Sequence, residues 1–195
     1  LVGSRQLGSA FLITGSDGNS SDLETHSDAS PQIWDASFKT ATLGGIALFD
    51  GYSSDLFKTG DLVCAVGSTA GVLYYPTEVT YADNTQEAVD YAYLPYPTYE
   101  GGEKIALQRG GGMCITAQSD ANQLAASIFV KWFTAPEQNL RFTLSSGYLP
   151  VTTEAFNQLF ESDLSTLAEP TISEQLQTIL RMYDEYQFFF APYSE

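Results

Sequence analysis

The sequence predicts an α/β fold, and three observations support this expectation. Hydrophobic residues make up 44% and charged residues 16% of the 195 residues, a balance typical of a folded globular protein. Strand-like and helix-like segments alternate in the first part of the chain, and helical patterns dominate after residue 119. The chain also leaves regular structure through two proline-containing connectors, near Pro95 and Pro97 and at residues 148–150. Paired connectors of this kind are expected where a chain crosses between two lobes.

The chain is expected to begin with an exposed loop and a helix. Residues 14–30 are rich in Ser, Asp, Gly and Asn, which is the composition of a loop. Ser30 can cap a helix that has Pro31 at its first position, and Gly44 with Gly45 can end it.

The middle of the chain predicts strands and a short helix. The apolar run from Leu62 to Val66 predicts a buried strand, which the small residues at 67–71 end, and residues 72–75 predict a short helix. Further strands are expected at residues 91–97, 104–108 and 113–117. Two prolines turn the first of these into an extended connector.

The second half of the chain predicts four helices. They are expected from Ser119 or Asp120, from Pro136 to Gly147, at residues 153–160, and after a capping box of Thr171 and Glu174. Their apolar stripes recur at helical spacing and are expected to pack inward. These stripes are Leu124, Ile128, Phe129, Trp132 and Phe133 in the first helix, Leu140 and Leu144 in the second, and Leu176, Ile179, Leu180 and Tyr183 in the last.

The charge balance disfavours nucleic acid and anionic lipid as partners. Against 24 acidic residues stand only 8 Lys and Arg, which gives a formal net charge of −16. Such a surface repels phosphate backbones. No apolar run approaches the about 20 residues that a membrane-spanning helix needs. The chain opens on Leu1 without an initiator Met, so we interpret it as a mature or trimmed piece whose export signal lies upstream.

The sequence shows no set of residues suited to metal or nucleophilic chemistry. Cys64 and Cys114 each lie in an apolar run and are expected to be buried free thiols. His26 is the single histidine and lies in the Ser- and Asp-rich loop, so neither a catalytic triad nor a metal cluster is expected. We therefore expect no cofactor.

Two alternative functions remain open from the residues alone. Glu100 and Glu103 flank Gly101 and Gly102 and could form the carboxylate pair of a carbohydrate-active enzyme. A non-catalytic surface adhesion domain is the other alternative, and it would have neither a cleft nor ligand-dependent stability.

Two glycine-bearing loops favour the binding of a polar solute. Residues 67–71 and 110–112 lack the lysine of a phosphate-binding P-loop. Small residues beside strands let backbone N–H groups approach a ligand closely. The chain also has 12 Tyr residues, and a Tyr ring with its hydroxyl suits sugars and polyols.

Four segments in this order resemble the family 1 bacterial extracellular solute-binding proteins, most closely the glycerol-3-phosphate and sugar-binding receptors. They are Phe57-x-x-Gly60-Asp61 running into Ser68-Thr69-Ala70-Gly71, the Leu94-Pro95-x-Pro97 connector, Gly110-Gly111-Gly112-Met113, and a helix pair that ends in Gly147-Tyr148-Leu149-Pro150-Val151. The resemblance spans roughly residues 48–192. The ordered set is more specific than any one of its segments.

The resemblance implies a type II periplasmic-binding-protein-like fold, with two α/β lobes joined by hinge strands. Residues 1–104 and 150–195 would belong to the C-terminal lobe, and residues 105–149 to the N-terminal lobe. The first part of the N-terminal lobe would be missing, so we expect a fragment. Its helices at 120–145 would expose apolar faces and could drive self-association.

The resemblance also implies ligand-binding residues. Ser68, with Thr69 beside it, matches a serine that binds ligand, and Gly111 or Gly112 matches a main-chain contact. Tyr148 matches a tyrosine whose hydroxyl faces the cleft. Trp34 and Tyr74 are further candidates for stacking on a sugar. A phosphate-binding arginine that such receptors use would lie beyond Glu195.

The function implied by the resemblance is that of a solute-binding component of an ABC importer. It would capture a sugar or a polyol- or glycerol-phosphate-like solute by hinge closure and present it to an ABC permease. The protein would be extracellular or periplasmic, anchored as a lipoprotein, and would not be an enzyme.

Overall fold

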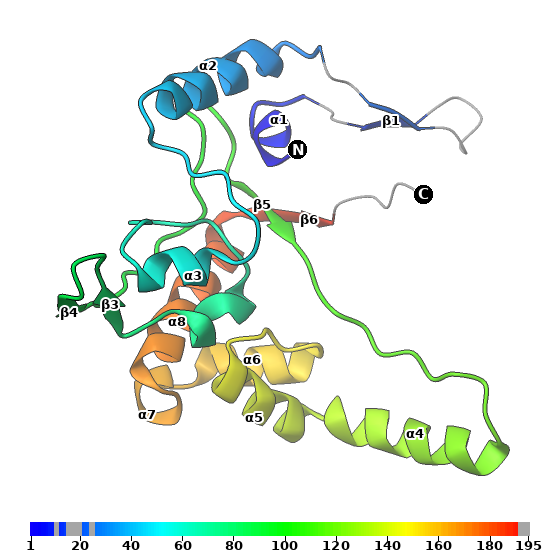
Figure 1. Ribbon diagram of the computed structural model, residues 1–195. Coiled ribbons are helices and arrows are strands. Elements are labelled where there is room, and N and C mark those ends of the chain that lie inside the picture. Colours follow the sequence, from blue (N-terminus) through cyan, green and yellow to red (C-terminus); the bar gives the residue numbers. More distant parts are fainter. Residues whose placement is uncertain (10–11, 15–20, 24–25, 191–195) are drawn as a thin grey trace. The chain divides into compact units, whose positions relative to one another are not determined.

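The computed structural model describes residues 1–9, 12–14, 21–23 and 26–190, and it combines helices with short strands as expected for an α/β protein (Figure 1). The chain divides into two compact units. Unit 1 comprises Leu1–Gly51, Tyr96–Arg109 and the chain from Met182, and unit 2 comprises Tyr52–Pro95 and Gly110–Arg181. Each unit is described by itself.

The described residues of unit 1 form two helices and two small sheets. Its elements are α1 (Val2–Gln6), β1 (Leu12–Thr14), β2 (Ser21–Leu23), α2 (Ala29–Thr42), β5 (Ile105–Gln108) and β6 (Gln187–Phe190). The strands β1 and β2 pair antiparallel. The strands β5 and β6 pair in parallel, with Ile105 opposite Gln187.

Gln6 connects the separate segments of unit 1. Its side chain is buried, and Nε2 donates hydrogen bonds to the carbonyl oxygens of Pro97 at 3.0 Å and Ile105 at 2.9 Å. Its Oε1 accepts from the Tyr99 amide at 3.2 Å. Gly3 permits this packing because a Cβ there would lie 2.7 Å from the Tyr99 ring. Together these contacts fix residues 97–105 against α1.

Unit 2 is mainly helical. Its elements are α3 (Ser53–Lys58), the 3₁₀ helix η1 (Thr69–Tyr74), β3 (Glu78–Thr80), β4 (Gln86–Ala88), α4 (Asp120–Phe133), α5 (Pro136–Ser146), α6 (Thr153–Glu161), α7 (Leu164–Leu167) and α8 (Pro170–Glu185), which continues into unit 1 from Met182. The strands β3 and β4 form an antiparallel hairpin.

The hydrophobic core of unit 2 lies along the apolar face of α8. Its buried members are Val72, Leu159, Leu164, Ile172, Leu176 and Leu180. Leu140 and Leu144 of α5 pack against this cluster. The inward stripe of α8 is therefore confirmed, as is the inward face of α5. Burial of apolar area supplies most of the stabilisation of such a core.

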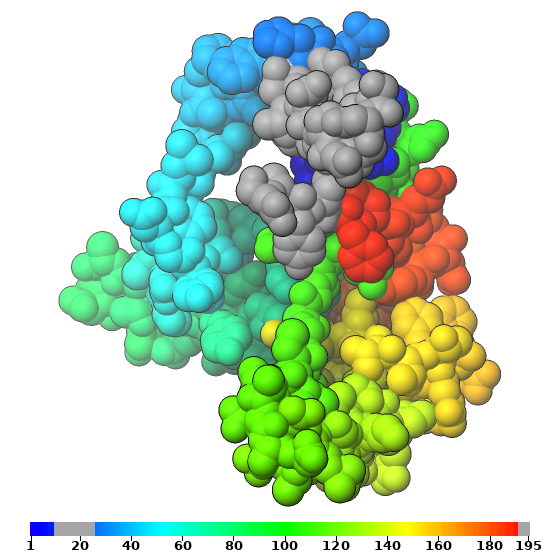
Figure 2. All heavy atoms as spheres, turned by 90° about the vertical axis from the view of Figure 1, so that its right-hand side faces the viewer, coloured from blue at the N-terminus to red at the C-terminus, as the bar shows by residue number. Residues whose placement is uncertain are grey.

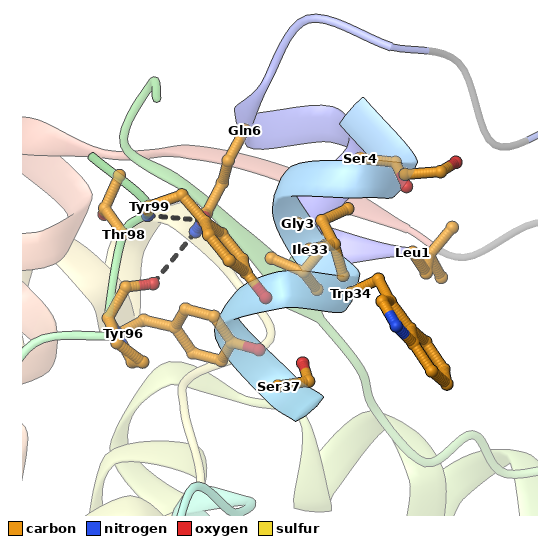
Figure 3. Close-up of a pocket in the computed structure, with 13 residues that line it drawn as sticks. Leu1, Gly3, Ser4, Gln6, Ile33, Trp34, Ser37, Tyr96, Thr98 and Tyr99 are labelled. Atoms are coloured by element: carbon orange, nitrogen blue, oxygen red, sulfur yellow. Dashed lines mark hydrogen bonds between the residues drawn. The ribbon is translucent and has the colours of Figure 1, made fainter. Parts of the chain in front are cut away.

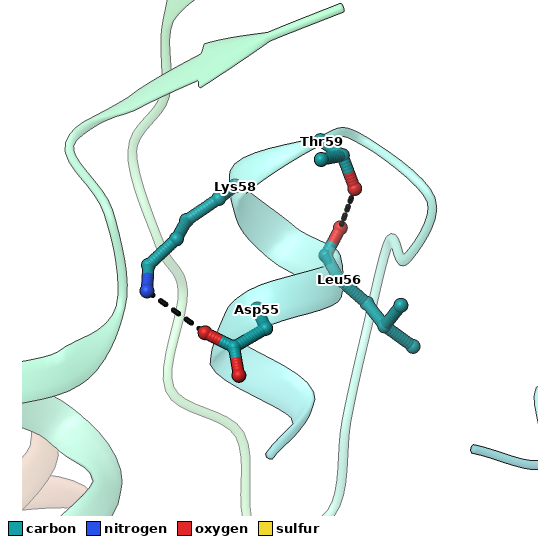
Figure 4. Close-up of polar contacts among 4 residues, drawn as sticks. All are labelled: Asp55, Leu56, Lys58 and Thr59. Carbon is teal, nitrogen blue, oxygen red and sulfur yellow. Dashed lines mark hydrogen bonds and ion pairs between the residues drawn. The ribbon is translucent and has the colours of Figure 1, made fainter. Parts of the chain in front are cut away.

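An aromatic cluster packs α3, which precedes η1 in the chain, against the rest of this unit. Phe57 of α3 is buried and meets the rings of Tyr75 and Tyr91 edge-on, at 5.2 and 5.7 Å between centroids. The Tyr91 hydroxyl donates to the carbonyl oxygen of Pro76 at 2.8 Å. By contrast, the Lys58–Asp55 ion pair of α3, 2.8 Å long, is solvent-exposed and contributes little stability (Figure 4).

Local signals predicted most helix ends correctly. Ser119 caps α4 and accepts a hydrogen bond from the Asn122 amide, and Pro136 is the first residue of α5. Gly147 ends α5 in the left-handed region at φ +73°. The helix α2 begins at Ala29, slightly before the predicted cap at Ser30. The helix α8 begins at Pro170, which places Thr171 inside its first turn and not at the predicted cap.

Several strand predictions were wrong. Residues 62–66, 91–97 and 113–117 form no strand. The strand predicted at residues 104–108 does form, as β5, because β6 pairs with it. An isolated strand leaves its backbone groups unpaired, so an apolar run becomes a strand only where a neighbour is present. Cys64 and Cys114 lie in the two unpaired runs and are exposed, contrary to the expected burial.

The apolar face of α4 is uncovered. No residue of α4 is buried, although the structure describes the whole helix. Its predicted inward side chains are 63% exposed at Leu124, 60% at Ile128 and 51% at Trp132. Figure 2 shows the side chains of residues 110–133, in green, open to solvent on the face that it presents. The expected exposure of apolar faces at 120–145 is thus confirmed for α4.

Candidate functional site

Two of the predicted ligand-binding segments meet in unit 2. The first is the start of η1, where the Ser68 hydroxyl accepts a hydrogen bond from the Ala70 amide at 3.3 Å. The second is the end of α5, where the chain passes through Gly147 into Tyr148. A Cβ on Gly147 would lie 2.7 Å from Cγ1 of Val72 and 3.2 Å from the Thr69 carbonyl oxygen. We call this contact between residues 68–72 and 147–148 the turn junction.

The backbone of the turn junction depends on glycine at position 147. Its φ of +73° lies in the left-handed region, which side-chain-bearing residues adopt at a cost. Its amide donates to the carbonyl oxygen of Thr143 at 3.0 Å, which closes the last turn of α5. The sequence predicted Gly147 as a helix end, but only the packing shows that Val72 leaves no room for a side chain.

Tyr148 lies at the surface beside the junction. Its side chain is 46% exposed, and its ring contacts the Phe142 ring at 5.6 Å between centroids. This pair continues a row of aromatic contacts from α4, in which Phe129 meets Phe133 at 5.9 Å and Phe133 meets Phe142 at 5.2 Å. Tyr148 thus combines a ring that contacts Phe142 with a side chain that is partly open to solvent.

Gly111 and Gly112 do not lie at the turn junction. They belong to an irregular, exposed segment between β5 and α4. A Cβ built on either would have no described atom beyond its chain neighbours within 4 Å. The structure therefore brings Ser68, Thr69 and Tyr148 into one region and leaves the glycine run apart.

Unit 2 contains buried polar atoms that have no hydrogen-bond partner in the described part of the chain. Within the described part of the chain, three such atoms occur, namely Tyr93 OH, Thr143 Oγ1 and Gln175 Oε1. Two of them belong to residues that contact Gly147: its amide bonds to Thr143, and Gln175 Oε1 would lie 3.1 Å from a Cβ there. Unpaired buried polar atoms are uncommon in folded proteins and call for an explanation.

Tyr93 is a buried donor of the same unit. Burial raises the pKa of its phenol to about 12, with smaller contributions from Tyr75, Glu174 and Tyr91. The phenol therefore stays protonated across the physiological pH range, and its O–H remains a hydrogen-bond donor.

Unit 1 contains a separate hollow of about 840 Å³ between α1, α2 and residues 96–99 (Figure 3). Its lining combines aromatic rings and hydroxyls, and no charged side chain is among the lining residues. Trp34 stands at this hollow, 64% exposed, with its ring stacked on Phe38 at 5.6 Å. Trp34 therefore lines a hollow, as stacking on a sugar would require. Tyr74 is 69% exposed and lines neither this hollow nor the smaller one in unit 2.

Unit 2 has a smaller hollow of about 490 Å³ along α4 and α5. Trp132, Phe133 and Phe142 line it together with Arg141, which places a cation among aromatic rings. The hollow borders the same row of rings that leads to Tyr148.

Glu100 and Glu103 are both exposed and line neither hollow. Both make hydrogen bonds through the backbone: the Glu100 carbonyl oxygen accepts from Gln32, and the Glu103 amide donates to the Gln6 carbonyl oxygen. Among the described residues, no three His, Cys, Asp or Glu side chains are close enough to hold a metal ion. No described helix combines the length and apolarity that a membrane span requires.

An α/β chain that brings a serine-bearing turn and a tyrosine-bearing connector together has the features of a protein that binds a small molecule. Residues 23–167 match the family model of the bacterial extracellular solute-binding proteins. Because this match covers most of the chain, the chain belongs to that family. No curated protein and no solved structure gives a match.

Family membership confirms the general role that the sequence implied. Proteins of this family bind a small-molecule solute outside the cytoplasm for ABC transporters, and they are generally not enzymes. The match includes η1, α4, α5 and the Gly147–Tyr148 connector, so the turn junction lies inside the region that defines the family.

Proposed function

We propose that this protein captures a sugar or a polyol- or glycerol-phosphate-like solute and delivers it to an ABC permease. The observation that carries the proposal is the turn junction, because it places the Ser68 and Tyr148 segments side by side although they are far apart in the sequence. A serine hydroxyl, backbone amides and an aromatic hydroxyl are groups that recognise polyhydroxylated ligands.

Electrostatics favour an uncharged solute over an anion. The chain carries a formal net charge of −16, which repels anions unless a local cation compensates. The Ser68 turn and the Tyr148 connector contribute no cation of their own. Binding of a glycerol phosphate would therefore depend on a cation supplied from elsewhere in the full-length protein.

Capture is proposed to proceed by hinge closure between two lobes. Residues 1–104 and 150–195 would form the C-terminal lobe, residues 105–149 part of the N-terminal lobe, and the remainder of that lobe would lie outside this chain. In the closed state Gly111 or Gly112 would approach the solute through backbone amides, since no described atom beyond their chain neighbours would lie within 4 Å of a Cβ there. A solute drives closure to the extent that it binds the closed state more tightly.

The protein is proposed to act at the membrane surface as a lipoprotein, extracellular or periplasmic. Within the proposed fold, the uncovered face of α4 would pack against the rest of the N-terminal lobe. The 195-residue chain alone would instead cover this face by self-association.

Calorimetry of the full-length protein tests the proposal against two groups of solutes, neutral sugars and polyols in one and glycerol phosphates in the other. Binding in either group supports the function and decides between the two solute classes. A bound solute at 100 times its Kd should also raise the free energy of unfolding by about 2.7 kcal/mol. No heat of binding and no stabilisation with any member would contradict it.

The enzyme alternative requires a different result. If the protein converts a sugar into a product, and the paired changes Glu100→Gln and Glu103→Gln abolish that conversion, the carbohydrate-active alternative replaces the receptor function. Unchanged solute after prolonged incubation supports the receptor.

A further inference from the structure

Gln175 touches both halves of the turn junction. It lies on α8 and is only 5% exposed. Its Nε2 donates a hydrogen bond of 2.8 Å to the carbonyl oxygen of Thr69, beside Ser68. Its Oε1 would lie 3.1 Å from a Cβ on Gly147, beside Tyr148. One carboxamide therefore contacts the two segments that carry the proposed ligand-binding hydroxyls.

The orientation of this carboxamide is fixed by chemistry. Only its nitrogen can donate to a carbonyl oxygen, so Nε2 must face Thr69 and Oε1 must face Gly147. In this orientation Oε1 has no hydrogen-bond partner in the described part of the chain. An unpaired buried acceptor is unfavourable, and an apolar side chain of similar size would avoid that cost. Gln175 is therefore not the residue that would best serve core packing alone.

We infer that Gln175 is a positioning residue, which sets the spacing between the Ser68 turn and the Tyr148 connector and thereby tunes solute affinity. This inference rests on the proposed function. Gln175 also lies beyond the residues 23–167 that match the family model, on the helix that forms the core of unit 2. The α8 helix thus bonds the Thr69 segment through Nε2 of Gln175 and packs beside Gly147 with Oε1 of the same side chain.

The same helix offers a matched control. Thr178 is 3% exposed, and its hydroxyl donates a hydrogen bond of 2.9 Å to the carbonyl oxygen of Tyr93. It donates the same kind of bond, from the same helix to a connecting segment, and its hydroxyl also accepts a hydrogen bond of 2.9 Å from Nη2 of Arg181. Neither partner belongs to the turn junction. Loss of the bond from either residue should lower the free energy of unfolding. Only loss of the Gln175 bond removes the contact that positions Thr69.

The experiment compares Gln175→Met with Thr178→Val in the full-length protein. The solute found by calorimetry is titrated into each variant well below its melting temperature. Gln175→Met should raise Kd by about tenfold, the effect of losing one hydrogen bond from the positioned state, and Thr178→Val should change it less than about twofold. Equal Kd values for wild type and Gln175→Met, or equal losses in both variants, would overturn the inference.

Gln175→Glu adds a test by rescue. The carboxylate keeps the size but has no hydrogen to donate to the Thr69 carbonyl, so it should bind solute more weakly than wild type at neutral pH. Its protonated form regains a donor, so the deficit relative to wild type should shrink as the pH is lowered. A deficit independent of pH would count against the hydrogen bond as the cause.

Hydrogen exchange provides a readout that needs no solute. Gln175→Met should speed amide exchange in residues 68–72 and in residues 147–149 together, and Thr178→Val should speed it near residue 93 instead. Unchanged exchange in both junction segments would refute the coupling. If the wild type binds no solute, both the proposed function and the role of Gln175 in solute affinity are wrong. Faster amide exchange in both junction segments of Gln175→Met would still show that Gln175 couples these two segments.

Discussion

Gly147 and Val72 approach each other so closely that a single added methyl group would separate them. The Cβ of an alanine at position 147 would lie 2.7 Å from Cγ1 of Val72. Gly147 also has φ +73°. The position therefore combines backbone strain with a steric clash, and these two costs can be measured separately.

Gly147→Ala should lower the free energy of unfolding by more than Gly44→Ala. Gly44 has φ +75°, but a Cβ there would meet nothing within 4 Å, so its substitution costs only the left-handed backbone, about 1–2 kcal/mol. The clash with Val72 should add about 1–3 kcal/mol at position 147. Urea denaturation measures both values. An equal loss of unfolding free energy in Gly147→Ala and Gly44→Ala would show that Val72 can move away from the added methyl group without an energetic cost.

Tyr93→Phe should leave the protein as stable as wild type at neutral pH, or more stable. The variant removes a buried hydroxyl that has no hydrogen-bond partner in the described part of the chain. Tyr91→Phe is the control, because it removes a bond of 2.8 Å to Pro76 and should cost about 1 kcal/mol. A loss at position 93 as large as that at position 91 would indicate a bond to Tyr93 that this structure does not contain.

Alkaline pH should destabilise the protein through Tyr93. Burial raises the pKa of Tyr93 from 10.0 to about 12, so the folded state retains a proton that the unfolded state releases. The ionisation of Tyr93 therefore leaves the free energy of unfolding unchanged below pH 10 and lowers it as the pH rises from 10 toward 12. The free energy of unfolding of Tyr93→Phe should fall less steeply over this range. Denaturation curves between pH 9 and 12 test this, and parallel pH profiles would contradict it.

Ser68→Ala and Tyr148→Phe should weaken solute binding, with no loss of stability beyond the small cost of removing the Ser68 cap of η1. Both side chains are exposed, so removal of either hydroxyl leaves the core intact. Each deletion should raise Kd by about fivefold to tenfold if the hydroxyl contacts the solute. Calorimetry gives Kd, and thermal unfolding checks the fold. Unchanged Kd in both variants would remove these residues from the binding site.

The 195-residue chain alone should self-associate through α4. Leu124 and Ile128 are 63% and 60% exposed on the uncovered face of this helix. Replacing both by Gln should shift the chain toward monomer, whereas Lys131→Gln, an exposed polar change on the same helix, should not. Light scattering at several concentrations measures this. A wild-type chain that stays monomeric at every concentration would contradict the prediction.

Structural elements with local signals could be predicted from the amino-acid sequence. Ser119, Pro136 and Gly147 mark helix ends through capping, a preset φ and a left-handed φ, and each of these acts within a few residues. The apolar spacing of α8 likewise predicted its buried face, including Leu176 and Leu180. The ordered motifs also predicted the family that the match at residues 23–167 confirms.

Which segments meet in space could not be predicted from local patterns. The apolar run at 62–66 carries a strand-like pattern, but no described segment pairs with it, and the stripe of α4 carries a core pattern, but none of its residues is buried. Gln175 gave no signal in the sequence, because its importance comes from contacts with Thr69 and Gly147, both distant along the chain. Strand pairing and side-chain burial both require a second segment of the chain. A local sequence pattern shows that a segment can pair or be buried, but it does not show which segment is the partner.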